Sequence, residues 1–167
     1  MANSLVTGTS TGAGASTTDG NAMQAYGQTS ASPQGTDTTQ SYDGASWSSE
    51  GTGSYSTRAS NQGCGDSSDP RDDFYAFGGY DPATSADRLF ASNFSGGSWT
   101  NITPLPSDRT SPACMYVSAT EIYAFGGHDG SSYMNDGIMY DGSSFSSATG
   151  TTNVSHYGAM GGANVTP

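Results

Sequence analysis

The sequence contains no lysine and little positive charge. Its only cations are four arginines, against 15 aspartates and glutamates, which gives a formal net charge of −11. A surface of this charge repels nucleic-acid phosphates and anionic membranes, so we expect no nucleic-acid partner. No apolar stretch approaches the roughly 18 residues of a membrane span, and the N-terminus lacks the basic and apolar segments of a secretory signal. We therefore expect that the protein is synthesised in a cytoplasm and that it does not insert into a membrane.

Helix-forming residues are also scarce. Leucine and glutamate are infrequent, and no window has the apolar i, i+3, i+4, i+7 spacing of an amphipathic helix. The chain is instead rich in Ser, Thr and Gly, and its aromatic residues (Tyr 10, Phe 6, Trp 2) recur along its length. Short strands joined by glycine-rich turns explain both features, so the sequence predicts an all-β fold.

One motif, Tyr-Ala-Phe-Gly-Gly, occurs twice in the chain. Its most informative positions are Phe77, Gly78, Gly79, Phe125, Gly126 and Gly127. Further upstream, Tyr26-Gly27 is an eroded copy that we align with Phe77-Gly78. A glycine pair at a strand end is typical of positive φ or of close backbone approach.

Two further marks keep the same order. An aromatic residue follows a turn three times, as Trp47, Trp99 and Phe145. A third mark surrounds Cys64, Cys114 and Met160. Arg58 and Arg109 take the same place in the first two copies of this mark. The three marks share a period of about 50 residues, which indicates a structural repeat.

Each repeat predicts four strands. Strands two to four are expected within residues 22–50, 73–103 and 121–148, and first strands within 58–65, 109–117 and 154–162. Asp-Gly and Gly-Gly pairs before each turn aromatic predict tight hairpins between strands three and four.

This pattern resembles the kelch repeat, whose unit is one four-stranded blade of a β-propeller. The resemblance covers about residues 21–162 and implies an all-β chain of three kelch-like blades. The sequences of the repeats are most similar to degenerate kelch-type repeats in tail and structural proteins of marine bacteriophages. The first unit departs from the pattern with Gly-Gln for Gly-Gly, and the third with Phe145 for Trp.

Three blades are too few for a closed propeller, which has four or more. We expect residues 21–167 to carry the blades and a C-terminal strand that is exchanged with a second copy, giving a dimeric six-bladed ring. Residues 1–20 would then be a flexible arm. Alternatively, residues 4–12 supply the missing first strand, or the blades form an open fibre array.

Candidate ligand-binding residues lie in the loops after strand two, because variable loops on a rigid scaffold commonly carry recognition. They are Tyr80, His128, Asp129 and Tyr133. His128 with Asp129 has the chemistry of an acid–base pair, but a solvated loop histidine beside a turn aspartate explains the same residues. No phosphate loop or His-Glu-x-x-His motif is present.

The remaining candidates have structural explanations. The aspartates of one acidic loop offer calcium ligands without the regular spacing of a calcium loop; they are Asp66, Asp69, Asp72 and Asp73. Trp47 and Trp99 could stack on sugars, but their shared repeat position favours packing. Cys64 and Cys114 are predicted to be small buried residues at equivalent positions, with neither a disulfide framework nor zinc.

These observations predict a non-enzymatic virion protein of a bacteriophage, assembled in the host cytoplasm. It would decorate the capsid or form part of a head or tail fibre, with other virion proteins as partners and no cofactor. One alternative is an adhesin whose strand-two loops bind cell-surface glycans. A second alternative is a fragment of a propeller enzyme.

Overall fold

The computed structural model describes residues 12–16, 20–28, 35–53, 59–66, 68–84 and 89–156, with only the backbone of residues 150–156. Within these residues every regular element is a β-strand. The prediction of an all-β fold is confirmed.

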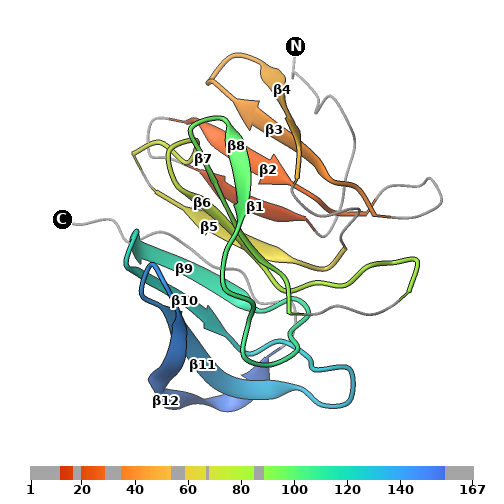
Figure 1. Cartoon of the computed structure of the whole chain (residues 1–167), viewed down its shortest axis with the longest axis vertical. Coiled ribbons are helices and arrows are strands. Elements are labelled where there is room, and N and C mark those ends of the chain that lie inside the picture. The colour runs from red at the N-terminus through yellow and green to blue at the C-terminus, as the bar shows by residue number, and fades with distance from the viewer. Residues whose placement is uncertain are drawn as a thin grey trace.

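The strands form three four-stranded antiparallel sheets, here called blades 1, 2 and 3, which follow one another along the long axis (Figure 1). Blade 1 consists of β1 (Ala13–Ser16), β2 (Ala22–Ala25), β3 (Thr38–Tyr42) and β4 (Trp47–Thr52). Blade 2 consists of β5 (Gln62–Gly65), β6 (Phe74–Phe77), β7 (Ala91–Ser95) and β8 (Ser98–Asn101). Blade 3 consists of β9 (Ala113–Ser118), β10 (Glu121–Phe125), β11 (Met134–Tyr140) and β12 (Phe145–His156).

The first strands of the blades lie beside one another, β1 against β5 and β5 against β9. One apolar cluster fills the junction of blades 1 and 2, and another fills the junction of blades 2 and 3. The first contains Ala13, Met23, Ala25, Tyr26, Phe74, Ala76, Phe90 and Phe94. The second contains Cys64, Tyr75, Phe77, Ala91, Leu105, Cys114, Tyr116, Ile122, Ala124, Ile138 and Tyr140.

Tight turns join the third and fourth strands as predicted. In blade 3 the carboxylate of Asp141 accepts hydrogen bonds from the backbone N–H groups of Ser143 and Ser144, at 2.9 and 2.8 Å. Asp43 makes the same kind of turn in blade 1. Aspartate side chains commonly stabilise turns in this way.

The first strand of blade 1 differs from the predicted one. It is Ala13–Ser16 of the same chain, paired with Ala22–Ala25 and directly following the alternative segment 4–12. Strand exchange is therefore not needed to complete blade 1. Residues 154–156, expected to begin a new first strand, instead continue β12, where His156 pairs with Met134. Residues 1–11 and 157–167 lie outside the described residues.

The alignment of the eroded motif is wrong by one residue. Tyr26 and Gly27 have φ angles of +58° and +112°, which match Gly78 and Gly79 at +67° and +85°. The hydrogen bonds agree, because Tyr26 donates to Thr38 O as Gly78 donates to Phe90 O. Tyr26-Gly27 thus stands in place of the glycine pair, with a tyrosine in the left-handed region.

Candidate functional site

The segments that follow the second strands of blades 2 and 3 form the candidate site. We call residues 78–84, 89–90 and 126–133 the loop rim. It has a blade 2 part (78–84 and 89–90) and a blade 3 part (126–133), and each of these two parts begins at a glycine pair whose positive φ turns the chain out of its sheet. A Cβ on Gly78 would collide with the carbonyl oxygen of Arg109, and one on Gly79 would lie 2.6 Å from Ala59 O. Close backbone packing therefore requires glycine at both positions.

Arg109 holds the two parts of the loop rim together. Its side chain is fully buried, and Nη1 donates to the carbonyl oxygen of Gly126 at 2.7 Å. Nη2 donates to Asp136 at 2.6 Å, while the backbone oxygen of Arg109 accepts from Gly79 N at 2.9 Å. The arginine that keeps phase in the repeat is therefore a structural clamp between blades 2 and 3. Arg58, its counterpart, lies outside the described residues.

His128, Asp129 and Tyr133 are brought together in blade 3. The rings of His128 and Tyr133 meet edge to face, with centroids 5.1 Å apart. Asp129 Oδ1 accepts from the N–H groups of Ser131 and Ser132, both at 2.7 Å, and these bonds hold the pKa of Asp129 below its ordinary value. The aspartate therefore has the bonding of a turn residue.

Nδ1 of His128 accepts a hydrogen bond from Gly130 N at 2.9 Å. In the neutral ring the proton therefore lies on Nε2. Both members of the expected acid–base pair thus accept hydrogen bonds that help to form one loop.

Tyr80 occupies the position in blade 2 that His128 occupies in blade 3. Tyr80 pairs with Ala59 through two backbone hydrogen bonds of 2.9 and 3.0 Å, as His128 pairs with Thr110. The four predicted ligand-binding residues therefore lie in equivalent loops of neighbouring blades, but the ring contact joins only His128 and Tyr133 among them.

Two large apolar side chains of the loop rim are exposed. Tyr133 is 61% exposed and Leu89 is 37% exposed, and they are the exposed large hydrophobic residues of the part of the chain that the structure describes. Both lie between the second and third strands of their blades. Leu89 was not among the predicted site residues; its signal was a large apolar residue directly after a mostly polar stretch of the loop.

The aspartates of the acidic loop of blade 2 bond to several different groups of the protein. Asp69 pairs with Arg71 at 2.7 Å, and the hydrogen bond from this arginine lowers the pKa of Asp69. Asp66 accepts from Ser68 N at 2.7 Å. Asp73 lies 3.4 Å from the Tyr116 hydroxyl. These carboxylates are thus engaged by different protein donors.

Asp72 takes part in the same loop as a backbone donor to Asp69 O. Within the described ranges, no group of three or more His, Cys, Asp or Glu residues is placed to hold a metal ion. No helix in that part of the chain is long and apolar enough to span a membrane.

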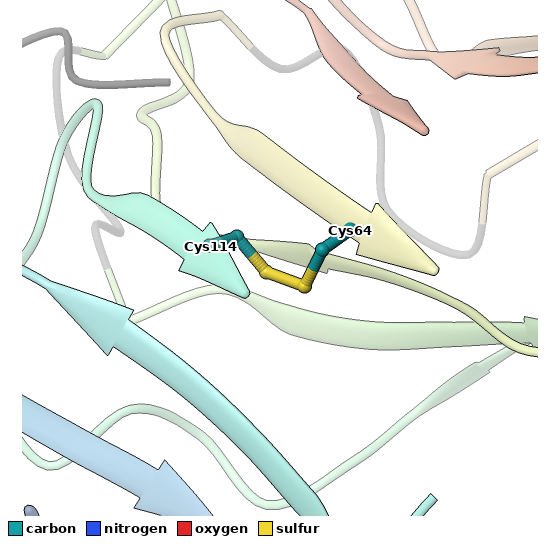
Figure 2. The surroundings of a disulfide bond; sticks show 2 residues. All are labelled: Cys64 and Cys114. Atoms are coloured by element: carbon teal, nitrogen blue, oxygen red, sulfur yellow. A yellow bond between two sulfur atoms is a disulfide. The ribbon is translucent and has the colours of Figure 1, made fainter. Parts of the chain in front are cut away.

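Cys64 and Cys114 form a disulfide between β5 and β9, contrary to the prediction of two separate buried cysteines (Figure 2). Their Cα atoms are 5.5 Å apart. The two are not at equivalent positions, because Cys64 pairs with Tyr75 whereas Cys114 pairs with Ala124, the counterpart of Ala76. This offset of one residue turns the two side chains toward each other, since alternate residues of a strand face opposite sides.

Two of the three turn aromatics pack between blades. The indole N–H of Trp99 donates to Thr39 Oγ1 of blade 1 at 2.7 Å, and its ring lies 5.2 Å from that of Tyr26. Phe145 of blade 3 lies 5.6 Å from Phe77 of blade 2. Trp47 contacts Tyr42 of its own blade, at 5.4 Å. The fourth-strand aromatic therefore packs against the preceding blade wherever one is present.

This geometry agrees with the comparison of the sequence with known families. Residues 109–144 match the model of the Kelch motif. The matched segment runs from Arg109 through the glycine pair to the turn before Phe145, so it contains the first three strands of blade 3. No curated protein matches the chain. The match and the three antiparallel sheets together define kelch-like blades of the β-propeller type.

Proposed function

We propose that this chain is a non-enzymatic structural protein of a bacteriophage particle, acting as a capsid decoration or as part of a head or tail fibre. The observation that carries the proposal is the disulfide between blades 2 and 3. Structural disulfides persist in oxidising surroundings, and a particle released from its host meets such surroundings. The resemblance of the repeats to phage structural proteins also supports the proposal.

The bonding of the polar side chains in and beside the loop rim supports a structural role for the protein over a catalytic one. Asp129 and the Nδ1 atom of His128 accept backbone hydrogen bonds within one loop, and Arg109 is buried in a blade junction. A net charge of −11 keeps such a module soluble and apart from nucleic acid. Capsid or tail proteins are then its expected partners.

Mass spectrometry of purified particles tests this proposal. Particles purified from a lysate should contain the chain at a fixed copy number, with Cys64 and Cys114 linked. Particles from a mutant phage that lacks the gene for this chain serve as the control. Recovery of the chain only in the soluble lysate, with none on the particles, would contradict a virion role.

A second candidate function is ligand binding by the loop rim, for example of cell-surface glycans. It rests on Tyr133, which is 61% exposed beside the His128 ring, because exposed aromatic residues on rigid loops are frequent recognition sites. On a glycan array, Tyr133→Ala and Tyr80→Ala should each reduce binding at least about tenfold. Thr100→Ala, on exposed β8, is the control and should leave binding unchanged.

A further inference from the structure

The middle blade shows what covers each face of a sheet in this protein. Phe74 and Ala76 of β6 belong to the cluster shared with blade 1, whereas Tyr75 and Phe77 belong to the cluster shared with blade 3. All four side chains are buried. Each face of blade 2 is thus covered by a neighbouring blade.

Among the described residues, blade 3 has such a neighbour on one face. Ile122 and Ala124, the counterparts of Phe74 and Ala76, are buried against blade 2. Tyr123 and Phe125 point to the opposite side, where they stack at 5.6 Å and are only partly buried. We call the blade 3 open face the partly buried set Met115, Tyr123, Phe125 and Met139. The two methionines are the cross-strand partners of Tyr123.

In the part of the chain that the structure describes, blade 1 has the complementary face open. Tyr42 and Trp47 are a cross-strand pair, as are Phe94 with Trp99 and Tyr140 with Phe145 in the other blades. In blades 2 and 3 this pair packs on the preceding blade. In blade 1 it is partly buried, together with Ala22 beside Tyr42. We call Ala22, Tyr42 and Trp47 the blade 1 open face.

The junction of blades 2 and 3 specifies how the two open faces would meet. There Tyr75 lies 6.1 Å from Tyr140, and Phe77 lies 5.6 Å from Phe145. The same register would place Tyr123 on Tyr42 and Phe125 on Trp47. The polar edge is repeated as well, because the Tyr123 hydroxyl donates to Glu121 at 2.8 Å where that of Tyr75 is directed at Asp73.

We propose that two copies of the chain close a six-bladed ring by packing the blade 3 open face of each copy on the blade 1 open face of the other. Glu121, which accepts the hydrogen bond of the Tyr123 hydroxyl, is the charged group at the edge of the blade 3 open face. The residues named in the two open faces are uncharged, and their aromatic pairs match those that the fold already joins. Two copies form two identical junctions, a closed two-fold arrangement, and six blades is within the usual range of propellers. Each copy keeps its own β1, so no strand is exchanged, and the inference is independent of the proposed function.

The test is the solution mass of the full chain by light scattering, with two opposed variants. The wild type should have twice the 17.0 kDa chain mass. Tyr123→Lys and Tyr42→Glu should each raise the dimer dissociation constant at least about 30-fold, since each alters both junctions. Tyr133→Glu, a comparable change on the loop rim, should remain dimeric. Circular dichroism of each variant verifies its fold.

Mixing the two variants gives the sharper result. A mixed dimer has one unaltered junction and one in which the introduced lysine of one copy would face the introduced glutamate of the other. Mixing Tyr123→Lys with Tyr42→Glu should therefore restore the dimer. A wild-type monomer at about 100 μM would overturn the proposal, since a dimer of micromolar affinity is largely formed there. So would a mass larger than two chains, a variant that stays dimeric, or a mixture that stays monomeric.

Discussion

The two blade junctions join equivalent strands by different means. Between blades 1 and 2, a Cβ on Gly63 would lie 2.7 Å from the Cβ of Ala13, so glycine allows β5 to approach β1 closely. The junction is then held by packing and by the hydrogen bond from Trp99 to Thr39. Between blades 2 and 3, the inner strands are linked by the disulfide, and Arg109 adds a buried clamp. One repeat architecture thus accommodates a covalent junction beside a non-covalent one.

Removal of the disulfide should have the largest effect, because it makes the second junction as dependent on packing as the first. The bond closes a loop with a sequence separation of 50 residues, and the loss of this constraint on the unfolded chain is expected to cost about 4 kcal/mol. Urea denaturation of a Cys64→Ala, Cys114→Ala double variant measures it. Reductant should destabilise the wild type similarly and leave the double variant unchanged.

Gly78→Ala should be next, at roughly 2–3 kcal/mol. The residue has a φ of +67° and faces the carbonyl oxygen of Arg109 across the second junction. Gly96→Ala is the matched control, with a φ of +58° and nothing within 4 Å of an added Cβ; it should cost only about 1 kcal/mol. Equal losses in denaturant midpoints would show that strain alone, and not the junction, explains the glycine.

Thr39→Val tests the first junction and should cost about 1–2 kcal/mol. The change keeps the side-chain shape but leaves the indole N–H of Trp99 without its acceptor. Thermal and urea unfolding measure the loss, with the exposed Thr100→Val as the control. A loss no greater than that of the control would mean that packing alone holds blades 1 and 2.

The smallest effect concerns the outer turns of the two end blades. Backbone N–H groups of Ser144 and Ser143 lower the pKa of Asp141 from 3.8 to about 2. Because the folded-state pKa is lowered, this stabilisation is present above about pH 4 and is lost as the pH falls toward 2. A carboxyl NMR titration should give a midpoint near 2 for Asp141. Asp43, in the equivalent turn, should also titrate below 3.8.

The sequence was sufficient to predict the blades but not their register. The recurring glycine pairs, turn aspartates and fourth-strand aromatics each have a local backbone cause, so their positions could be predicted. The pairing of Cys64 with Cys114 could not be predicted, because similarity between repeat sequences does not determine strand register to one residue. A shift of one residue moves a side chain to the other face of its sheet. One such shift, between β5 and β9, makes the disulfide possible. A separate shift, after β2, places Tyr26 at a glycine position.

The candidate site shows the same division. Local spacing was enough to place Tyr80, His128, Asp129 and Tyr133 in equivalent loops. The contact of His128 with Tyr133 depends on how that loop folds back after Asp129, and Leu89 required knowledge of exposure. Loop geometry and burial are tertiary properties, and the repeat does not encode them.

The covalent link between β5 and β9 also determines how the protein responds to mechanical load. When the chain is pulled from its two ends, tension passes directly from Cys64 to Cys114 through the sulfur atoms. The intervening segment, which includes β6, β7 and β8, carries no force until the bond is reduced. At roughly 3.5 Å per extended residue, about 175 Å of chain is withheld from extension, so reduction would lengthen the unfolded molecule in one discrete step.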